Sequence, residues 1–364
     1  MTGKNQTLTF YTGGNPSAKE THRAPLPVSS VRDWSNAEGY IADENLIKAV
    51  NVAITVGRPL LVTGEPGTGK SDLAKSVAYN LGLGEPLEFI VKSDMESRDL
   101  FYTFDAVGRF NAPKSSGNEP HGPGKANGIT EFITYNALGE AILRANKLDD
   151  VKPYLRLASL PDEKWQPQRS VVLIDEVDKA PRDVPNDILS EIDRLEFDIP
   201  ELSLQAGKPV KITAPKAFRP IVIITSNLEK SLPDAFLRRC VYYHLPFPSP
   251  EDLLKIVESR LGSRYQENST FVKSACDYFR YLRSENLRLN KRPATAELLD
   301  WLFVLLHSLP DGTPLPAHVE KHPRFEDSVL CTLLKTQADQ DRAPSLLKGF
   351  KDANPTIMSM ASTP

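Results

Sequence analysis

The segment from residue 64 to residue 71 has the glycine spacing and the lysine–serine ending of a loop that binds phosphate groups. An apolar run, 59–63, precedes it with the character of a buried strand, and apolar residues at helical spacing follow it. Glycines let backbone N–H groups turn toward an anion, and the next helix adds partial positive charge. The residues that we expect to bind the nucleotide are Gly64, Glu65, Pro66, Gly67, Thr68, Gly69, Lys70, Ser71 and Asp72.

Side chains from two segments could act on a nucleotide together. We expect the Lys70 ammonium to bind the β- and γ-phosphates and the Ser71 hydroxyl to be a ligand of Mg²⁺. Asp175 ends an apolar run, 171–174, and would help to hold the same ion. Glu176 comes next and would be the general base toward an attacking water. Because a kinase brings its own acceptor and needs no such glutamate, the adjacent acids favour hydrolysis of ATP.

Three later positions are candidates for contacts with the γ-phosphate. A third apolar strand, 221–226, is followed by Asn227, which could hydrogen-bond the attacking water or the phosphate, or could cap the next turn. Arg238 and Arg239 follow a short apolar helix and could be a solvated face or a finger inserted into a neighbour's site. Arg292 stands at a predicted helix start, where a positive charge is unfavourable without an anion, which indicates contact with a nucleotide phosphate.

In this order, the motifs resemble those of the AAA+ ATPases and, within them, of the MoxR family. The matching features are the phosphate loop, the acidic pair, a sensor asparagine, a finger arginine and a second sensor at Arg292. The stretch 51–71 and the segment 135–142 are also similar to MoxR sequences. The resemblance covers about residues 38–310.

The resemblance implies an α/β fold, with a P-loop core whose parallel sheet is flanked by helices, and a small α-helical lid domain. It implies that the finger is Arg239, with Arg238 as the alternative. Tyr40 and Ile41 would touch the adenine by analogy with the AAA+ linker, or would anchor the core. It also implies a homo-oligomer, a hexamer, which works beside a protein with a von Willebrand factor A domain.

Four parts are expected along the chain. Residues 1–37 are polar and contain proline, which is typical of a flexible arm. Residues 38–248 carry the nucleotide motifs, residues 249–342 form the lid, and residues 343–364 have few apolar anchors and form a tail. Helices of the lid are expected near residues 251–261, 269–285, 294–308 and 325–336.

Two excursions interrupt the nucleotide-binding part. The first, about residues 100–135, is rich in glycine, proline, serine and asparagine at its centre and predicts an exposed loop. Its role would be a contact with a pore or a partner, or it would be a disordered excursion. The second, about residues 197–213, predicts two short strands that form a hairpin around residues 205–208.

The composition argues against several classes of protein. The 364 residues include 44 basic and 47 acidic side chains, a formal net charge of −3, so no broad basic excess indicates nucleic-acid binding, which stays open. The three scattered cysteines fit a reducing cytoplasm better than a disulfide framework. No apolar run approaches the roughly 20 residues of a membrane span, and the N-terminus lacks a signal-peptide core.

The leading hypothesis is a ring-forming, Mg²⁺-dependent ATPase with a chaperone-like, remodelling or maturation role. One rival is a DNA-associated AAA+ motor of a restriction or defence system, against which the absence of a basic excess counts. The other rival is a nucleotide-gated scaffold that binds ATP without hydrolysing it, against which the intact Glu176 counts.

Overall fold

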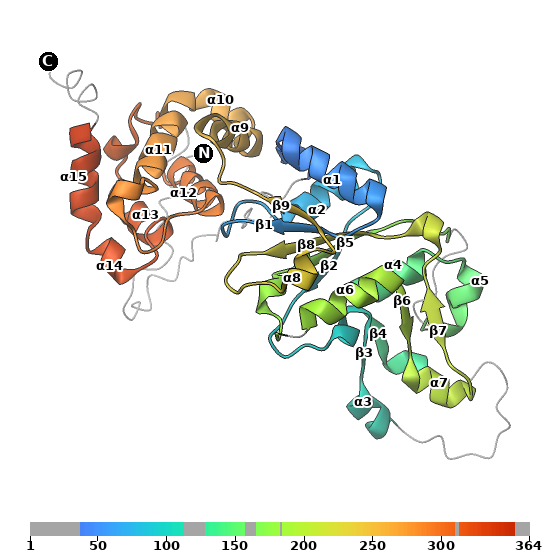
Figure 1. The fold of residues 1–364 in the computed structure, drawn as a ribbon. Coiled ribbons are helices and arrows are strands. Elements are labelled where there is room, and N and C mark those ends of the chain that lie inside the picture. The colour runs from blue at the N-terminus through green and yellow to red at the C-terminus, as the bar shows by residue number, and fades with distance from the viewer. Residues whose placement is uncertain (1–36, 113–127, 157–164, 183, 310–312, 354–364) are drawn as a thin grey trace, which may run out of the picture. The chain divides into compact units, whose positions relative to one another are not determined.

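The computed structural model describes residues 37–112, 128–156, 165–182, 184–309 and 313–353 of the chain. The described residues form two compact units (Figure 1). An α/β unit contains residues 42–65 and 69–246, and a helical unit contains residues 37–41, 66–68 and the described residues from 247 onward. No helix in the described ranges is long and apolar enough to cross a membrane. The expected N-terminal arm falls almost wholly outside those ranges.

A five-stranded parallel sheet in the order β2-β5-β8-β1-β9 forms the centre of the α/β unit (Figure 1). Its three middle strands are buried apart from the last residue of β5, and they are apolar up to their C-terminal ends. This pattern is typical of strands covered on both faces, and it confirms the predicted α/β fold. The strands are β1 (Leu60–Thr63), β2 (Leu87–Ile90), β5 (Val171–Asp175), β8 (Ile221–Ser226) and β9 (Val241–His244).

Helices cover the sheet on both faces (Figure 1). The first begins where the Asp43 side chain accepts hydrogen bonds from the N–H groups of Asn45 and Leu46, and it ends at Gly57, whose φ of 65° is readily adopted only by glycine. Helices α2 and α4 both pack on strand β5. The helices are α1 (Glu44–Val56), α2 (Asp72–Asn80), α4 (Ala137–Arg144), α5 (Leu148–Val151), α6 (Val184–Arg194) and α8 (Asp234–Leu237).

The first excursion carries a small antiparallel sheet of β3 (Tyr102–Phe104) and β4 (Ile133–Tyr135). Helix α3 (Ala106–Asn111) follows β3, and a 3₁₀ turn, η4 (Ile129–Phe132), precedes β4. The centre of the predicted loop, residues 113–127, lies outside the described ranges. The two ends of the predicted excursion therefore form paired strands, and the described part adds a short helix.

The second excursion differs from the predicted hairpin. Strands β6 (Glu196–Asp198) and β7 (Lys211–Thr213) do pair antiparallel, but helix α7 (Pro200–Ala206) connects them instead of a tight turn. Pro200 occupies the first turn of the helix, where its missing N–H costs nothing, and Gly207 ends the helix with a φ of 64°. The predicted turn at residues 205–208 is thus the end of a helix.

The helical unit is built around aromatic side chains. The Tyr278 ring lies 4.9 Å from the Phe325 ring, 5.0 Å from the Phe350 ring and 6.0 Å from Trp301. The helices of this unit are α9 (Pro250–Leu261), α10 (Ser263–Glu267), α11 (Ser269–Leu282), α12 (Thr295–His307), α13 (Phe325–Thr332), α14 (Gln337–Gln340) and α15 (Ala343–Ala353).

The predicted C-terminal tail is wrong for its first part. Residues 343–353 form α15, because Leu346 and Phe350 stand four residues apart on one face and are both buried in the aromatic core. Leu347 and Ala343 pack partly buried on the same core and add to these two contacts. Residues 354–364 lie outside the described ranges.

We predict that Gly139→Ala strongly destabilises the α/β unit. A Cβ atom on Gly139, inside α4, would lie 2.0 Å from the backbone oxygen of Phe101, which also accepts a hydrogen bond from the Asn136 N–H. Because backbone cannot swing aside as a side chain does, we expect a loss of about 2–3 kcal/mol. Thermal unfolding should show a midpoint lowered by roughly 4–10 °C. Glu140→Gln on the same helix should change it little, and an unchanged midpoint for Gly139→Ala would contradict this packing.

Candidate active site

The parallel register places the ends of three strands side by side. Leu61 of β1 pairs with Ile224 of β8, and Ile174 of β5 pairs with the same residue from the other side. The phosphate loop, the acidic pair and the third polar tip therefore leave the sheet at the same edge, where open α/β sheets bind ligands. The α/β unit thereby brings together nine of the predicted residues: Gly64, Glu65, Gly69, Lys70, Ser71, Asp72, Asp175, Glu176 and Asn227.

Lys70 lies folded against its own loop. Its ammonium donates hydrogen bonds to the backbone oxygens of Gly64, at 3.0 Å, and Glu65, at 2.8 Å. Burial lowers the pKa of Lys70, and the nearby carboxylate of Asp175 opposes that shift. Gly69, with a φ of 87°, gives the chain the left-handed turn that sets Lys70 at the start of α2. The cation is thus held next to the backbone that would surround a phosphate.

Asp175 joins the three strand ends through hydroxyl groups. The Ser71 hydroxyl donates to both of its carboxylate oxygens, at 2.9 and 3.1 Å. The Thr225 hydroxyl donates to Oδ1 of Asp175 and accepts a hydrogen bond from the Glu176 N–H at 2.9 Å. The carboxylate and the Ser71 hydroxyl therefore lie close enough to bind one cation together.

Glu176 has a backbone conformation that residues other than glycine rarely adopt. Its φ of 61° and ψ of 48° lie in the left-handed region, so the chain turns sharply at the end of β5. The side chain is bonded on both oxygens. Asn227 Nδ2 donates to Oε1 at 3.4 Å, and the Lys179 ammonium contacts Oε2 at 2.5 Å. The predicted base and the predicted sensor therefore touch each other directly.

A buried carboxylate shapes the loop that carries Asn227. Asp178, in the 3₁₀ turn η7 (Val177–Lys179), accepts hydrogen bonds from the backbone N–H of Asn227 at 3.4 Å and of Glu229 at 3.0 Å. Its own side chain is almost inaccessible to solvent. A charged group in this position fixes the start of the loop, because moving the loop would leave the charge without donors.

The sequence interpretation missed three of these contacts, those of Thr225, Asp178 and Lys179. Thr225 is the last but one residue of β8, and its polar character at the strand end was the available signal. Asp178 and Lys179 lie two and three residues after Glu176, and their contacts depend on the tight η7 turn, which no local pattern announces.

The remaining predicted residues are placed differently. Arg238 and Arg239 end α8, are exposed, and have no side-chain partner among the described residues. Arg292 belongs to the helical unit and lies three residues before the first residue of α12, next to the helix start at which it was predicted. Tyr40 and Ile41 also belong to that unit. Their predicted contacts with a nucleotide stay predictions.

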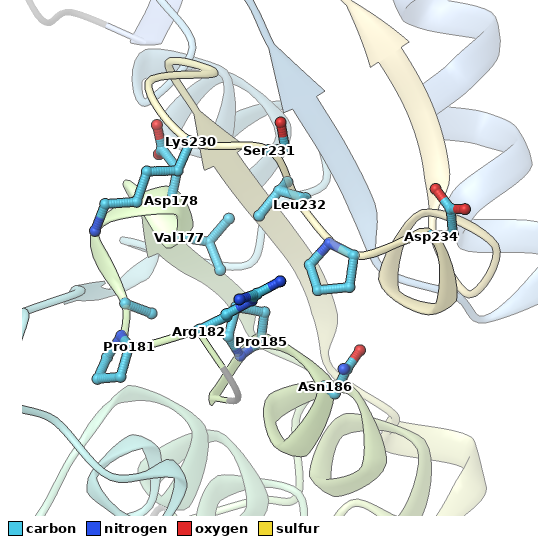
Figure 2. Close-up of a pocket in the computed structure, with 12 residues that line it drawn as sticks. Val177, Asp178, Pro181, Arg182, Pro185, Asn186, Lys230, Ser231, Leu232 and Asp234 are labelled. Carbon is cyan, nitrogen blue, oxygen red and sulfur yellow. The ribbon is translucent and has the colours of Figure 1, made fainter.

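An open pocket of about 820 Å³ lies beside the acidic turn (Figure 2). The η7 turn and the start of α6 form one wall, and the loop before α8 forms the other. Its lining mixes apolar groups such as Pro181 and Leu232 with charged ones such as Arg182 and Lys230. None of the phosphate-loop residues contributes to it, so it is a separate hollow next to the strand ends.

The donor set fits Mg²⁺ held jointly with a nucleotide. Mg²⁺ is usually held by one or two protein oxygens together with phosphates and water, not by a cage of protein ligands. Ser71 and Asp175 provide such a pair of oxygen ligands. In the described ranges no cluster of three or more histidine, cysteine or acidic side chains could hold a metal alone.

Family comparison agrees with this geometry. No curated protein matches the chain. Residues 59–240, half of the chain, match the AAA domain of the dynein-related subfamily. The match spans the phosphate loop, the acidic pair, Asn227 and both candidate finger arginines, and it supports the AAA part of the predicted resemblance without reaching the MoxR subgroup. The chain therefore belongs to the AAA family, in its dynein-related subfamily.

Proposed function

We propose that the protein is a ring-forming ATPase of the MoxR type that uses Mg²⁺-dependent ATP hydrolysis to remodel or mature a partner protein. An AAA domain implies an ATPase that binds ATP with Mg²⁺. The observation that supports hydrolysis by this chain most directly is the meeting of Ser71, Asp175, Glu176 and Asn227 at the ends of three neighbouring strands.

The residues would divide the reaction among them. The Lys70 ammonium would give up its hydrogen bonds to the loop carbonyls and bind the β- and γ-phosphates instead. Little movement of the side chain would be needed, because the carbonyls belong to the same loop that would surround the phosphates. Ser71 and Asp175 would hold Mg²⁺, which neutralises charge that develops on the phosphates. Glu176 would take a proton from the attacking water, and Asn227, already in contact with Glu176, would orient that water.

A neighbouring subunit would complete the site. Arg239 is exposed, and its guanidinium has no partner in the described part of its own chain, which suits a finger that enters the next subunit. Arg238 has the same exposure and is the alternative. Arg292 would reach the nucleotide from the helical unit.

We propose a homo-oligomer, a hexamer, in the cytoplasm, working with a protein that has a von Willebrand factor A domain.

We predict that Glu176→Gln abolishes hydrolysis while leaving nucleotide binding intact. The amide cannot accept the proton of water but keeps the size of the side chain, so phosphate release should fall about 10²–10⁴-fold. Phosphate release and ATP binding should be measured on the assembled protein. Glu229→Gln, an exposed carboxylate on the neighbouring loop, is the matched control and should retain activity.

The same variant distinguishes the proposed enzyme from a non-hydrolysing scaffold. If Glu176→Gln releases phosphate at the wild-type rate, Glu176 is not the base. If the wild-type assembly binds ATP and releases no phosphate at all, the scaffold replaces the ATPase. Recovery of bound proteins from the Glu176→Gln assembly in ATP then tests the partner class, and recovery of DNA instead would favour the motor.

We predict that two inactive variants restore activity when mixed. Arg239→Ala subunits keep an intact phosphate loop, and Lys70→Ala subunits keep an intact finger, so a mixed ring contains some complete sites. With random 1:1 mixing, about a quarter of the interfaces would be complete, and the rate should approach that fraction of the wild-type rate. The mixture of Arg238→Ala with Lys70→Ala tests the alternative finger. The absence of rescue in both mixtures, with assembly intact, would contradict a finger acting across subunits.

We predict that Thr225→Val raises the Mg²⁺ concentration required for half-maximal hydrolysis about 10–100-fold. The change removes the hydroxyl that bonds Asp175 and leaves the Glu176 N–H without its acceptor, but keeps the shape of the side chain. Thr225→Ser retains the hydroxyl and serves as the control. A wild-type Mg²⁺ requirement in Thr225→Val would show that the hydroxyl does not orient the metal ligand.

A further inference from the structure

The segment that presents Arg292 is tied down on several sides. It runs from Arg288, which has a strained φ of 47°, to the start of α12. Arg292 itself is exposed, and its guanidinium has no partner among the described residues. Four backbone groups on either side of it, in contrast, are hydrogen-bonded to side chains of the helical unit.

The first tie is Asp339 of α14, a carboxylate with no accessible surface. Its Oδ1 accepts a hydrogen bond from the Asn290 N–H at 3.0 Å, and its Oδ2 accepts one from the Lys291 N–H at 3.2 Å and one from the Thr336 hydroxyl at 2.8 Å. Burial alone would raise the pKa of Asp339, but these hydrogen bonds outweigh burial and hold the pKa below its usual value. The carboxylate is therefore charged and fully committed to the loop.

Arg342 strengthens the same connection. Its guanidinium lies 3.9 Å from Asp339 Oδ1 and donates to the backbone oxygen of Leu287 at 2.7 Å. Asp339 and Arg342 thus contact the two residues before Arg292 and Leu287, which immediately precedes the segment. Asp339 and Asn290 lie about fifty residues apart in the chain, so their hydrogen bond is a tertiary contact and not a local helix cap.

The second tie lies on the other side of Arg292. Arg283, the residue after α11, donates to the backbone oxygen of Pro293 at 2.6 Å, and its guanidinium lies 3.4 Å above the centre of the Phe247 ring. The Ala294 N–H donates to Glu297 Oε2 at 2.7 Å. The backbone is consequently fixed at residues 290, 291, 293 and 294, while the Arg292 side chain stays exposed.

We propose that Asp339 is a positioning residue that holds the backbone of Asn290 and Lys291 so that Arg292 is presented in one orientation to an anionic phosphate. This inference rests on the proposed function, in which Arg292 contacts the nucleotide. It adds that α14, far along the chain from the nucleotide motifs, controls that contact. Burying the charge of Asp339 is energetically unfavourable. A loop that needed no fixed geometry would not require such a contact.

The test is a double-variant cycle on catalysis. Asp339→Asn keeps the size of the side chain, but its amide can accept from only one of the two N–H groups and presents a donor to the other. We expect kcat/KM for ATP to fall about 10-fold or more in Asp339→Asn, because small misplacements of a positioned group are costly. Asp341→Asn, an exposed aspartate two residues away, is the matched control and should behave as wild type.

The decisive outcome is the combination with Arg292→Ala. If Asp339 acts through Arg292, adding Asp339→Asn to Arg292→Ala causes no further loss of kcat/KM. If the two losses multiply, Asp339 acts only on stability and the inference is wrong. Thermal unfolding of all variants is measured in parallel, since a purely structural role would lower the midpoint without making the losses overlap.

The failure of this inference can be separated from failure of the proposed function. If Arg292→Ala leaves kcat/KM and ATP affinity unchanged, the proposed role of Arg292 is wrong, and this inference falls with it. If Arg292→Ala is impaired while Asp339→Asn matches wild type, the inference alone is overturned. Should Asp339→Asn fail to fold, Thr336→Val, which removes one hydrogen bond to the carboxylate, takes its place in the same cycle.

Discussion

The carboxylate of Asp175 is the contact on which the α/β unit depends. It ends the central strand β5 and bonds a hydroxyl from the phosphate loop after β1 and one from β8. Parallel strands alone would bring these ends to one edge of the sheet, but would leave their side chains free to point apart. The hydroxyls fix the carboxylate, and Thr225 also accepts a hydrogen bond from the N–H of Glu176, so the backbone position of Glu176 is linked to the side chain of Asp175.

Much of this site could be predicted because its chemistry lies in short, local patterns. A glycine loop between a strand and a helix and two acids after an apolar strand announce both their residues and their positions in a sheet. Thr225 and Asp178 could not be predicted in the same way. Their partners lie about fifty residues away, and each contact depends on strand register and on the sharp turn at Glu176.

The errors in the fold have a related cause. Residues 205–208 include turn-forming residues, which favoured a hairpin. Pro200 and Gly207, however, are typical of the two ends of a helix, and they mark the ends of α7. The prediction of a tail failed because the few apolar residues of 343–353 do not announce a helix by themselves, whereas Leu346 and Phe350 contact an aromatic core formed with other helices. Burial against distant residues overrode weak local signals in both cases.

Both units use the same device to hold a candidate sensor. Asp178 accepts hydrogen bonds from two backbone N–H groups at Asn227 and Glu229, and Asp339 does so from two N–H groups immediately before Arg292. Each carboxylate is buried, and a buried charge that loses its donors is far more costly than a broken neutral contact. A loop bound in this way cannot shift by small steps. If Asn227 and Arg292 contact a γ-phosphate as proposed, the response to it would lie in their side chains, because the neighbouring backbone is held.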